Sequence, residues 1–195
     1  MLTCPVLPPD WTPVRTDKSP SGAVLAEHFW LETGVPEELI GRRQIWLRDV
    51  NRQQEPRLLF EHQRIAEVLF SPDENWIAIN DQPLSDLADV RLFRRIRGLE
   101  YKETGSAQPG QKCWALLDRI ARRPVSGALD HAYVYALRWS PDTRALLLAA
   151  TGHLANDLSV RDWLCVFDIK AFKASTDLRL MNRGAINDRR GPADR

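Results

Sequence analysis

The sequence predicts a mostly β protein, built as a stack of about three small antiparallel sheets with one amphipathic helix. Three observations lead to this prediction. A turn signature that begins with Ser-Pro occurs at Ser19, Ser71 and Ser140. Each copy is followed by an apolar run, a polar loop and a second apolar run with interleaved charges. About four short strands in a unit of roughly 50 residues are typical of repeated β-sheet units.

The turn signature is clearest in residues 67–80 and 135–148, where an aromatic residue precedes Ser-Pro-Asp and two polar residues follow it. Proline sets φ near roughly −65° for the first corner of a type I turn and does not continue a central strand. Ser and Asp side chains accept hydrogen bonds from nearby backbone amides. The first copy keeps Ser19 and Pro20 but has Ser21 in place of the acid. We therefore expect a tight hairpin turn in all three copies.

The strands around these turns define three units within a single domain that spans residues 1–195. The units are residues 19–61, 67–103 and 132–180. The strands expected directly after each turn are 23–31, 76–80 and 145–149. The strands expected next are 44–50, 89–94 and 162–168, with weaker fourth strands at 57–61 and 98–102.

A segment at residues 106–124 interrupts the β pattern. Cys113, Leu116, Leu117 and Ile120 recur at helical spacing, which predicts an amphipathic helix near residues 112–123. Pro124 ends it, and the helix is expected to cover an exposed sheet edge. The last residues, 183–195, carry Gly, Asn, Pro and mixed charge and are expected to form a flexible tail.

The Ser-Pro-Asp turn with its preceding aromatic residue, followed by an apolar strand and a Leu-x-Asp-like strand, resembles the WD40-like (PD40) blades of TolB-type β-propellers. The resemblance covers most of the chain and is most specific in the second and third units. Glu74 and Thr143 stand where the family usually has glycine. Three blades are also too few to close a single-chain propeller. The resemblance therefore implies a partial propeller-like stack or a dimer that completes a ring, and a β-sandwich that reuses the hairpin is the alternative.

Composition and charge exclude several classes of protein. The 195 residues are 44% hydrophobic and 27% charged, which is typical of a globular protein and unlike a disordered or fibrous chain. A net charge of +1 gives no reason to expect binding to nucleic acid or to an anionic membrane. No apolar run approaches the roughly 18 residues of a membrane span. The proline-rich start is unlike a secretory signal, and we expect a cytoplasmic protein.

No motif predicts catalysis, a cofactor or a metal site. Cys4, Cys113 and Cys165 lack the spacing of metal or redox motifs, and no two of the four histidines lie within four residues of each other. Cys113 can be combined on paper with His131 and Asp130 into a nucleophilic set, but it fits the apolar face of the expected helix better. We therefore expect a non-enzymatic protein without a cofactor.

Loop charge gives the main functional indication. If the units are equivalent, the loops at 32–43, 81–89 and 151–162 leave the same edge of every sheet. They hold eight acidic and three basic residues. The acidic residues are Glu32, Glu37, Glu38, Asp81, Asp86, Asp89, Asp157 and Asp162. An acidic face would attract a basic partner, and the alternative is a set of simply solvated loop charges. Trp11 either holds the N-terminal arm on the body or serves as an exposed interface anchor.

The sequence thus predicts a protein-binding module, in its most concrete form a small bacterial immunity or inhibitor protein that uses an acidic loop face to block a basic protein partner. One alternative is a metal-dependent enzyme or divalent-cation-binding protein whose site is assembled from distant loops. Its candidate ligands are Asp81, Asp86, His153 and Asp157. Another alternative is a self-assembling subunit that completes a propeller ring as a homodimer.

Overall fold

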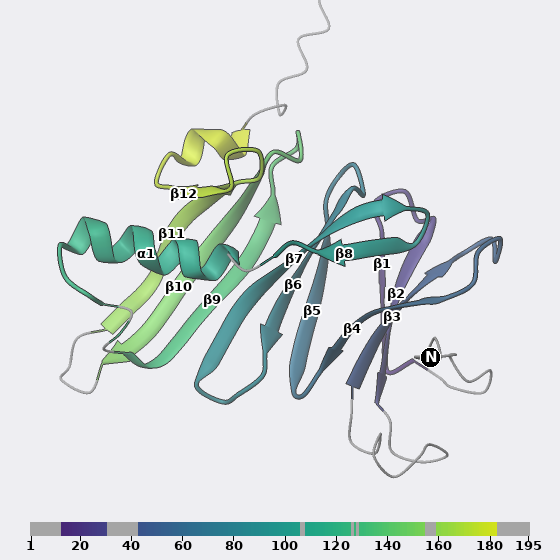
Figure 1. Ribbon diagram of the computed structural model, residues 1–195, viewed down its shortest axis with the longest axis horizontal. Helices are drawn as coiled ribbons and strands as arrows, with labels where there is room; N and C mark the ends of the chain where they lie inside the picture. Colours follow the sequence, from purple (N-terminus) through teal and green to yellow (C-terminus); the bar gives the residue numbers. More distant parts are fainter. Residues whose placement is uncertain are drawn as a thin grey trace, which may run out of the picture.

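A computed structural model describes residues 13–30, 43–105, 108–125, 127, 129–154 and 159–182. Within them the chain forms three consecutive antiparallel meanders, which we call the first, second and third units (Figure 1). The first unit contains β1 (Arg15–Lys18), β2 (Val24–Trp30), β3 (Arg43–Asp49) and β4 (Arg57–His62). The second contains β5 (Ile65–Phe70), β6 (Trp76–Gln82), β7 (Leu87–Arg97) and β8 (Glu100–Glu103). The third contains β9 (Leu129–Trp139), β10 (Ala145–Leu154), β11 (Ser159–Asp168) and β12 (Lys173–Ser175).

A short parallel contact joins the second unit to the third. Leu87 and Ala88 of β7 pair with Ala132 and Tyr133 of β9. The second and third units therefore form one eight-stranded sheet, whereas the first unit is a separate four-stranded sheet. The predicted mostly β fold is confirmed, although this contact merges two of the three expected sheets into one. Each unit has four strands, and β12, the fourth strand of the third unit, was not among those expected from the sequence.

The three Ser-Pro turns adopt the same hydrogen-bonded geometry. In the second turn, the Ser71 N–H donates to the Trp76 carbonyl oxygen and the Trp76 N–H donates to Ser71 Oγ, both at 2.9 Å. The equivalent pairs, with distances between 2.8 and 3.1 Å, are Ser19 with Val24 and Ser140 with Ala145. The predicted tight turn is thus present in all three copies, including the one that lacks the acid.

The fourth residue of each turn has a left-handed backbone, with φ of 75° at Gly22, 57° at Glu74 and 63° at Thr143. Glycine adopts this region without steric cost, whereas other residues do so at a cost in energy. At the two positions without glycine, the side chains of Glu74 and Thr143 contact the turn of the preceding unit. The Glu74 carboxylate accepts a hydrogen bond from the Ser21 N–H at 2.7 Å, and the Thr143 side chain hydrogen-bonds to the Asp73 carboxylate. The turns therefore form a chain of contacts along one rim of the molecule, at the top in Figure 1.

Two apolar cores hold the units together. The core between the first and second units contains Val24, Ala26, Ile45, Leu47, Ala66, Val68, Ile77, Ile79, Phe93 and Leu99. The core between the second and third units includes Ala78, Val90, Leu92, Val134, Ala136, Leu146, Leu148, Cys165 and Phe167. Because successive side chains of a strand point to opposite faces, Ile77 and Ile79 of β6 face one core and Ala78 faces the other. The second unit is consequently buried on both of its faces.

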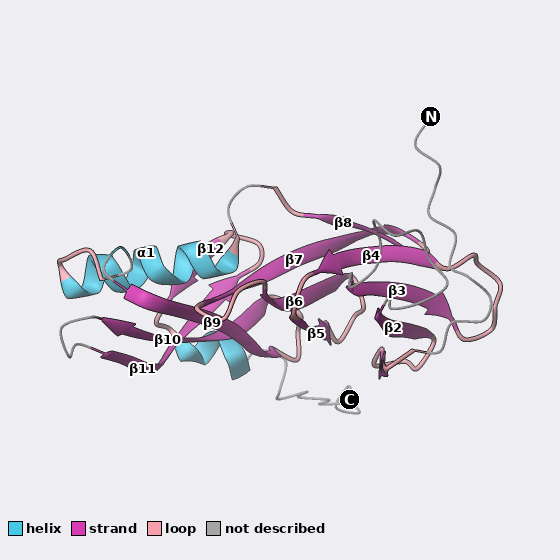
Figure 2. Cartoon of the chain, turned by 90° about the horizontal axis from the view of Figure 1, so that it is seen from below, coloured by secondary structure: helices cyan, strands magenta, loops and turns pink. Residues whose placement is uncertain are grey.

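The helix α1 (Pro109–Ala121) lies over the third unit (Figure 2). Cys113 and Leu116 join the core between the second and third units. The helix contacts β7, β9, β10, β11 and the edge strand β12, so it covers a face of the sheet that includes the edge strand rather than the edge alone. Ile120, expected on its buried face, is 53% exposed. No helix in the described part of the chain is long and apolar enough to cross a membrane.

The outer face of the third unit is only partly covered. The 3₁₀-helix η3 (Leu178–Asn182) places Leu180 and Met181 against Ala145, Leu147 and Val166. Beyond this contact, Leu137 and Leu164 of the same unit are 49% and 40% exposed. The expected tail at 183–195 lies outside the described residues.

Candidate functional site

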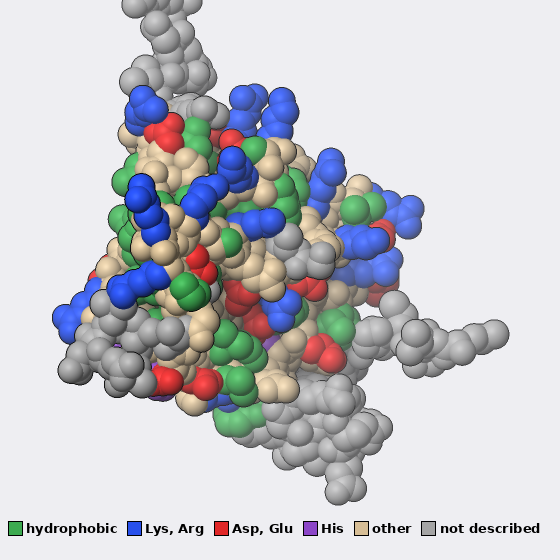
Figure 3. Space-filling view, turned by 60° about the vertical axis from the view of Figure 1, so that its left-hand side comes forward, with side chains coloured by type: hydrophobic (Ala, Val, Ile, Leu, Met, Phe, Trp, Pro, Cys, Tyr) green, Lys and Arg blue, Asp and Glu red, His purple; other side chains and the backbone are tan. Residues whose placement is uncertain are grey.

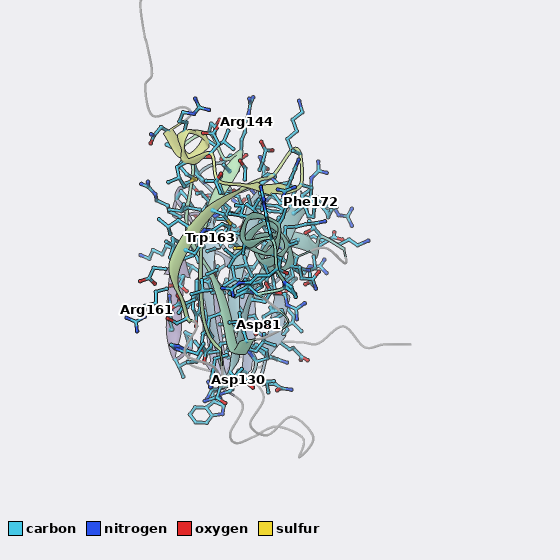
Figure 4. All side chains as sticks on the ribbon, turned by 90° about the vertical axis from the view of Figure 1, so that its left-hand side faces the viewer. Asp81, Asp130, Arg144, Arg161, Trp163 and Phe172 are labelled. Carbon is cyan, nitrogen blue, oxygen red and sulfur yellow. The ribbon has the colours of Figure 1, made fainter. Side chains whose placement is uncertain are left out.

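The loops predicted to share one edge do so where the structure describes them. The β6–β7 connection, the ends of β2 and β10 and the beginnings of β3 and β11 lie along the lower edge of the molecule in Figure 1. The Ser-Pro turns lie at the other end of the molecule: Arg144, beside the third turn, and Asp130, at the start of β9, mark the two ends in Figure 4. The predicted contact residues Trp11, Glu32, Glu37, Glu38 and Asp157 lie outside the described residues.

Asp81 is a buried structural residue rather than part of an acidic surface. It is 4% exposed, and one carboxylate oxygen lies 3.4 Å from Arg91 Nε. Its other oxygen is shielded from solvent and has no hydrogen-bond partner among the residues that the structure describes. Burial raises the pKa of Asp81 above its ordinary value, although Arg91 opposes the effect. The prediction that Asp81 contacts a partner is corrected, because its carboxylate is turned inward and paired with Arg91.

Asp89 contacts the N-terminus of α1. Its carboxylate accepts hydrogen bonds from the Val90 N–H, at 2.7 Å, and from the Gly110 N–H. A Cβ atom at position 110 would lie 1.8 Å from Asp89 Oδ1, so glycine is what allows this close approach. The helix has no side-chain hydrogen bond from its own N-cap, Gln108, and Asp89 supplies the acceptor from β7. Burial raises the pKa of Asp89 despite these hydrogen bonds. Asp89 is therefore a helix-positioning residue, which corrects its assignment to the partner-binding face.

Two of the predicted acidic residues remain on the surface. Asp86 and Asp162 are both exposed. The Thr151 hydroxyl donates to Asp162 Oδ1 at 3.3 Å, and the Asp162 N–H donates to Thr151 Oγ1 at 3.2 Å. This pair lies beside a register shift between Ala150 and Gly152, where β10 and β11 are irregular. The irregularity holds Asp162 at the border of a groove.

This groove, which we call the interunit groove, lies where the first strands of the units approach one another and has a volume of about 580 Å³. Its lining residues are Arg15, Glu67, Val68, Leu69, Asn80, Tyr133, Tyr135, Ala136, Leu137, Ala149, Thr151 and Asp162. The rings of Tyr133 and Tyr135 lie 6.3 Å apart and nearly parallel. The Tyr133 hydroxyl donates to the Ser85 carbonyl oxygen at 2.6 Å, which fixes its orientation. The groove therefore has a rigid aromatic wall.

The charged side chains of the interunit groove that have no ion-pair partner among the described residues are acidic. Glu67 and Asp162 are exposed, whereas the Arg15 guanidinium is paired with Asp17 at 2.9 Å. Asp17 also accepts a hydrogen bond from His28 at 2.9 Å. Burial opposes ionisation of Asp17, but its hydrogen bonds with His28 and Arg15 lower its pKa overall. In the view of Figure 3, Lys and Arg spread over the upper part of the surface, and Asp and Glu gather in its middle and lower part.

The structure does not bring together the other constellations drawn from the sequence. Cys113 is fully buried with its Sγ 3.2 Å from Cys165 Sγ, whereas Asp130 and His131 are exposed on β9. His131 Nδ1 lies 3.1 Å from the Tyr133 hydroxyl. Within the described ranges, no three His, Cys, Asp or Glu side chains are arranged to hold a metal ion. The expected ligand Asp157 lies outside those ranges.

The protein belongs to the class of mostly β proteins: it is a stack of three four-stranded β units with a groove along their first strands. No family model and no curated protein sequence matches the chain. Among solved structures, TolB from Acinetobacter baumannii is similar over 85% of this chain, with a TM-score of 0.45 and 11% sequence identity. The similarity covers 32% of the TolB chain, and a match at this level carries no argument about function.

The sequence interpretation missed Glu67, Tyr133 and Tyr135 as groove residues. A signal for the two tyrosines is present, since Tyr133, Tyr135 and Leu137 alternate along one face of a strand. Alternation alone does not say whether such a face is covered. The third unit leaves this part of its face open because η3 covers only the part near the Ser-Pro turn.

Proposed function

We propose that this protein is a non-enzymatic protein-binding module that takes a basic segment of a protein partner in the interunit groove. The observation that carries the proposal is the groove itself, with its volume of about 580 Å³, its two stacked tyrosines and its two exposed acids. Tyrosine is enriched at protein interfaces because its ring offers contact area at a small cost in conformational entropy.

The open face of the third unit extends the groove with apolar surface. Tyr135, Ala149 and Leu164 form one cross-strand row, and Leu137 lies at the irregularity between β9 and β10. Such a row resembles the sheet faces that pack against the next unit elsewhere in this molecule. Exposed aliphatic side chains beside aromatic ones are typical of the centre of an interface, while charged residues surround it. The row thus favours a macromolecular partner over a small ligand.

Charge complementarity favours a basic partner. Among the described lining residues, Glu67 and Asp162 are the exposed acids, and the one basic side chain, Arg15, is paired with Asp17. A basic segment entering the groove would gain attraction without facing an unpaired positive charge. The narrower form of the proposal is an immunity or inhibitor protein that blocks a basic toxin or enzyme, because electrostatic attraction raises the association rate.

The proposal is tested by affinity capture from the source lysate with three immobilised proteins. These are the wild type, the Glu67→Gln/Asp162→Asn variant and a control variant, Glu55→Gln/Glu100→Gln, which removes two exposed acids that do not line the groove. The expected result is one basic protein that the wild type and the control retain and the groove variant loses. Asn at 162 preserves the hydrogen bond with Thr151, so loss of binding reports the charge.

The Tyr135→Ala variant tests the aromatic wall separately. For a captured protein, we expect an affinity at least about tenfold lower than the wild type, as for a central interface tyrosine. Equal retention of the same proteins by all four forms would overturn the proposal. A stable homodimer with no captured protein, seen by light scattering, would instead support self-association.

A further inference from the structure

A second cavity lies at the loop edge between the first and second units and has a volume of about 300 Å³. The ends of β2 and β4 and the starts of β3 and β5 surround it. Arg15 borders both this cavity and the interunit groove, but the other lining residues differ. The volume is at the lower end of the range for small-molecule pockets, roughly 300 to 1,000 Å³. It fits a small molecule rather than a protein segment.

The cavity has an excess of positive charge. Arg43 and Arg64 line it, and neither has a carboxylate partner among the described residues. The Arg43 guanidinium carbon lies 4.9 Å from the centre of the Trp30 ring, a cation–π geometry that holds it in place. The neighbouring carboxylate of Asp17 is already engaged by Arg15 and His28. Within the described part of the chain, two guanidinium groups therefore have no carboxylate partner and can face an anion.

His62 adds an unpartnered hydrogen-bonding group to the same wall. Both ring nitrogens are shielded from solvent, and no described residue forms a hydrogen bond with either of them. The ring stacks on Phe60, and the His28 ring lies 6.5 Å away in an edge-on orientation. Burial, followed by the electrostatic influence of His28 and Arg43, lowers the pKa of His62 to about 4. At neutral pH the ring is neutral and keeps one N–H, and a shielded N–H without an acceptor is unfavourable.

The rest of the cavity wall is apolar. Phe29 and Ala66 are buried in it, and Trp30 and Ile65 are each about half exposed at its border. A fully hydrated inorganic ion would gain little from these side chains. An organic anion would place its hydrocarbon part on them while its charged group reached the arginines.

We propose that this cavity binds a small organic carboxylate, whose anionic group lies between Arg43 and Arg64 and accepts a hydrogen bond from His62. The planar guanidinium groups match the two oxygens of a carboxylate, and such charge-assisted hydrogen bonds are stronger than neutral ones. The carboxylate satisfies the His62 N–H, and Trp30 and Ile65 contact the hydrocarbon part. This site shares Arg15 with the interunit groove, but its proposal does not rest on a protein partner.

The test is a calorimetric titration with benzoate, with inorganic phosphate as the comparison ion. The proteins are the wild type, Arg43→Gln, Arg64→Gln and a control, Arg57→Gln. Arg57 lies on β4 like His62 but is exposed outside the cavity. We expect saturable benzoate binding by the wild type and the control, and about tenfold weaker binding by each of the other two variants. Phosphate should bind more weakly than benzoate because it cannot use the apolar wall.

A second measurement reports on His62 directly. NMR signals of the His62 ring should shift on addition of benzoate, and the pKa of His62 should rise from about 4 because an anion favours its protonated form. Absence of saturable benzoate binding in the millimolar range would overturn the proposal. Equal binding by all four proteins, or phosphate binding as strong as benzoate binding, would also contradict it. Neither result would bear on the protein-binding proposal, since the Arg43 and Arg64 side chains do not line the interunit groove.

Discussion

At the scale of single residues, the acidic side chains of this protein fall into two groups that the sequence does not separate. Asp81 and Asp89 are turned into the molecule, where they contact Arg91 and the start of α1 respectively, whereas Asp86 and Asp162 face solvent. Asp81 continues the alternation of the buried Ile77 and Ile79 along β6, which is a readable local signal. The contact of Asp89 with Gly110 depends on the position of α1, and no pattern near either residue indicates it. Burial, rather than residue type, decides which acids can meet a partner.

His62 leads to a prediction about pH. Its pKa is about 4 in the folded protein and about 6.5 in the unfolded chain, so the unfolded state binds more protons between these values. The free energy of unfolding should therefore fall as the pH is lowered from 7 toward 4. His62→Phe removes this titration and should show a smaller fall. The measurement is the urea midpoint of both proteins at pH 7 and pH 5, in buffers without carboxylates.

Other carboxyl groups do not produce the same difference between the two proteins. Asp17 has a lowered pKa, so its protonation lowers the free energy of unfolding only when the pH falls below the ordinary pKa of an aspartate. Asp81 and Asp89 have raised pKa values and act in the opposite direction, because the folded state binds their protons more readily. All three titrate in both proteins, so an equal change of midpoint in the wild type and His62→Phe would contradict the prediction.

At the scale of elements, the turns show why local structure was predictable. Ser-Pro fixes the first corner, and the serine hydroxyl accepts a backbone N–H five residues later in all three copies. Both features depend only on neighbouring residues, so the sequence indicates them directly. The helix shows the opposite case: Ile120 has the correct spacing for a buried face but is exposed. How far a helix is covered depends on the sheet beneath it, which its own periodicity does not describe.

The turn serines should be important for stability. Ser71→Ala and Ser140→Ala each remove the acceptor of a backbone N–H at a position that is fully buried. We expect each to lower the free energy of unfolding by about 1–3 kcal/mol, the cost of an unsatisfied buried donor. Ser85→Ala, at an exposed loop position, is the control and should change little. Chemical denaturation measures all three, and a cost for Ser71→Ala no larger than that of Ser85→Ala would refute the role of the hydroxyl.

The contact between Asp89 and Gly110 should position the start of α1. Gly110→Ala places a Cβ atom against Asp89 Oδ1 and forces the strand and the helix apart. Asp89→Ala removes the carboxylate and leaves the helix start without this acceptor, at an expected cost of about 1–2 kcal/mol. In the double variant the steric conflict no longer exists, so the two costs should not add. Additive costs in a double-mutant cycle would show that the two residues act independently.

At the scale of the whole molecule, the open face of the third unit contrasts with the outer face of the first. Glu27 and Trp46, which pair across β2 and β3 on the face turned away from the second unit, are both 2% exposed. A ring of two copies that packed the third unit of one on the first unit of the other would require this face to be free. Such a ring would therefore have to uncover buried side chains of the first unit. The number of units was predictable from the repeat, but which outer face stays open was not, because it depends on segments outside the repeat.

The two shared cores predict that the three units unfold together. The second unit contributes Ile79 to one core and Ala78 to the other, so neither neighbour can unfold without exposing apolar surface of the second unit. Ile79→Ala and Leu148→Ala, one in each core, should each cost about 2–5 kcal/mol. Both should move the same transition, seen alike by far-UV circular dichroism and by tryptophan fluorescence. Leu164→Ala, on the open face, should leave the midpoint nearly unchanged. Two separate transitions, each moved by only one of the core variants, would mean instead that the cores form independently and that the second unit does not couple them.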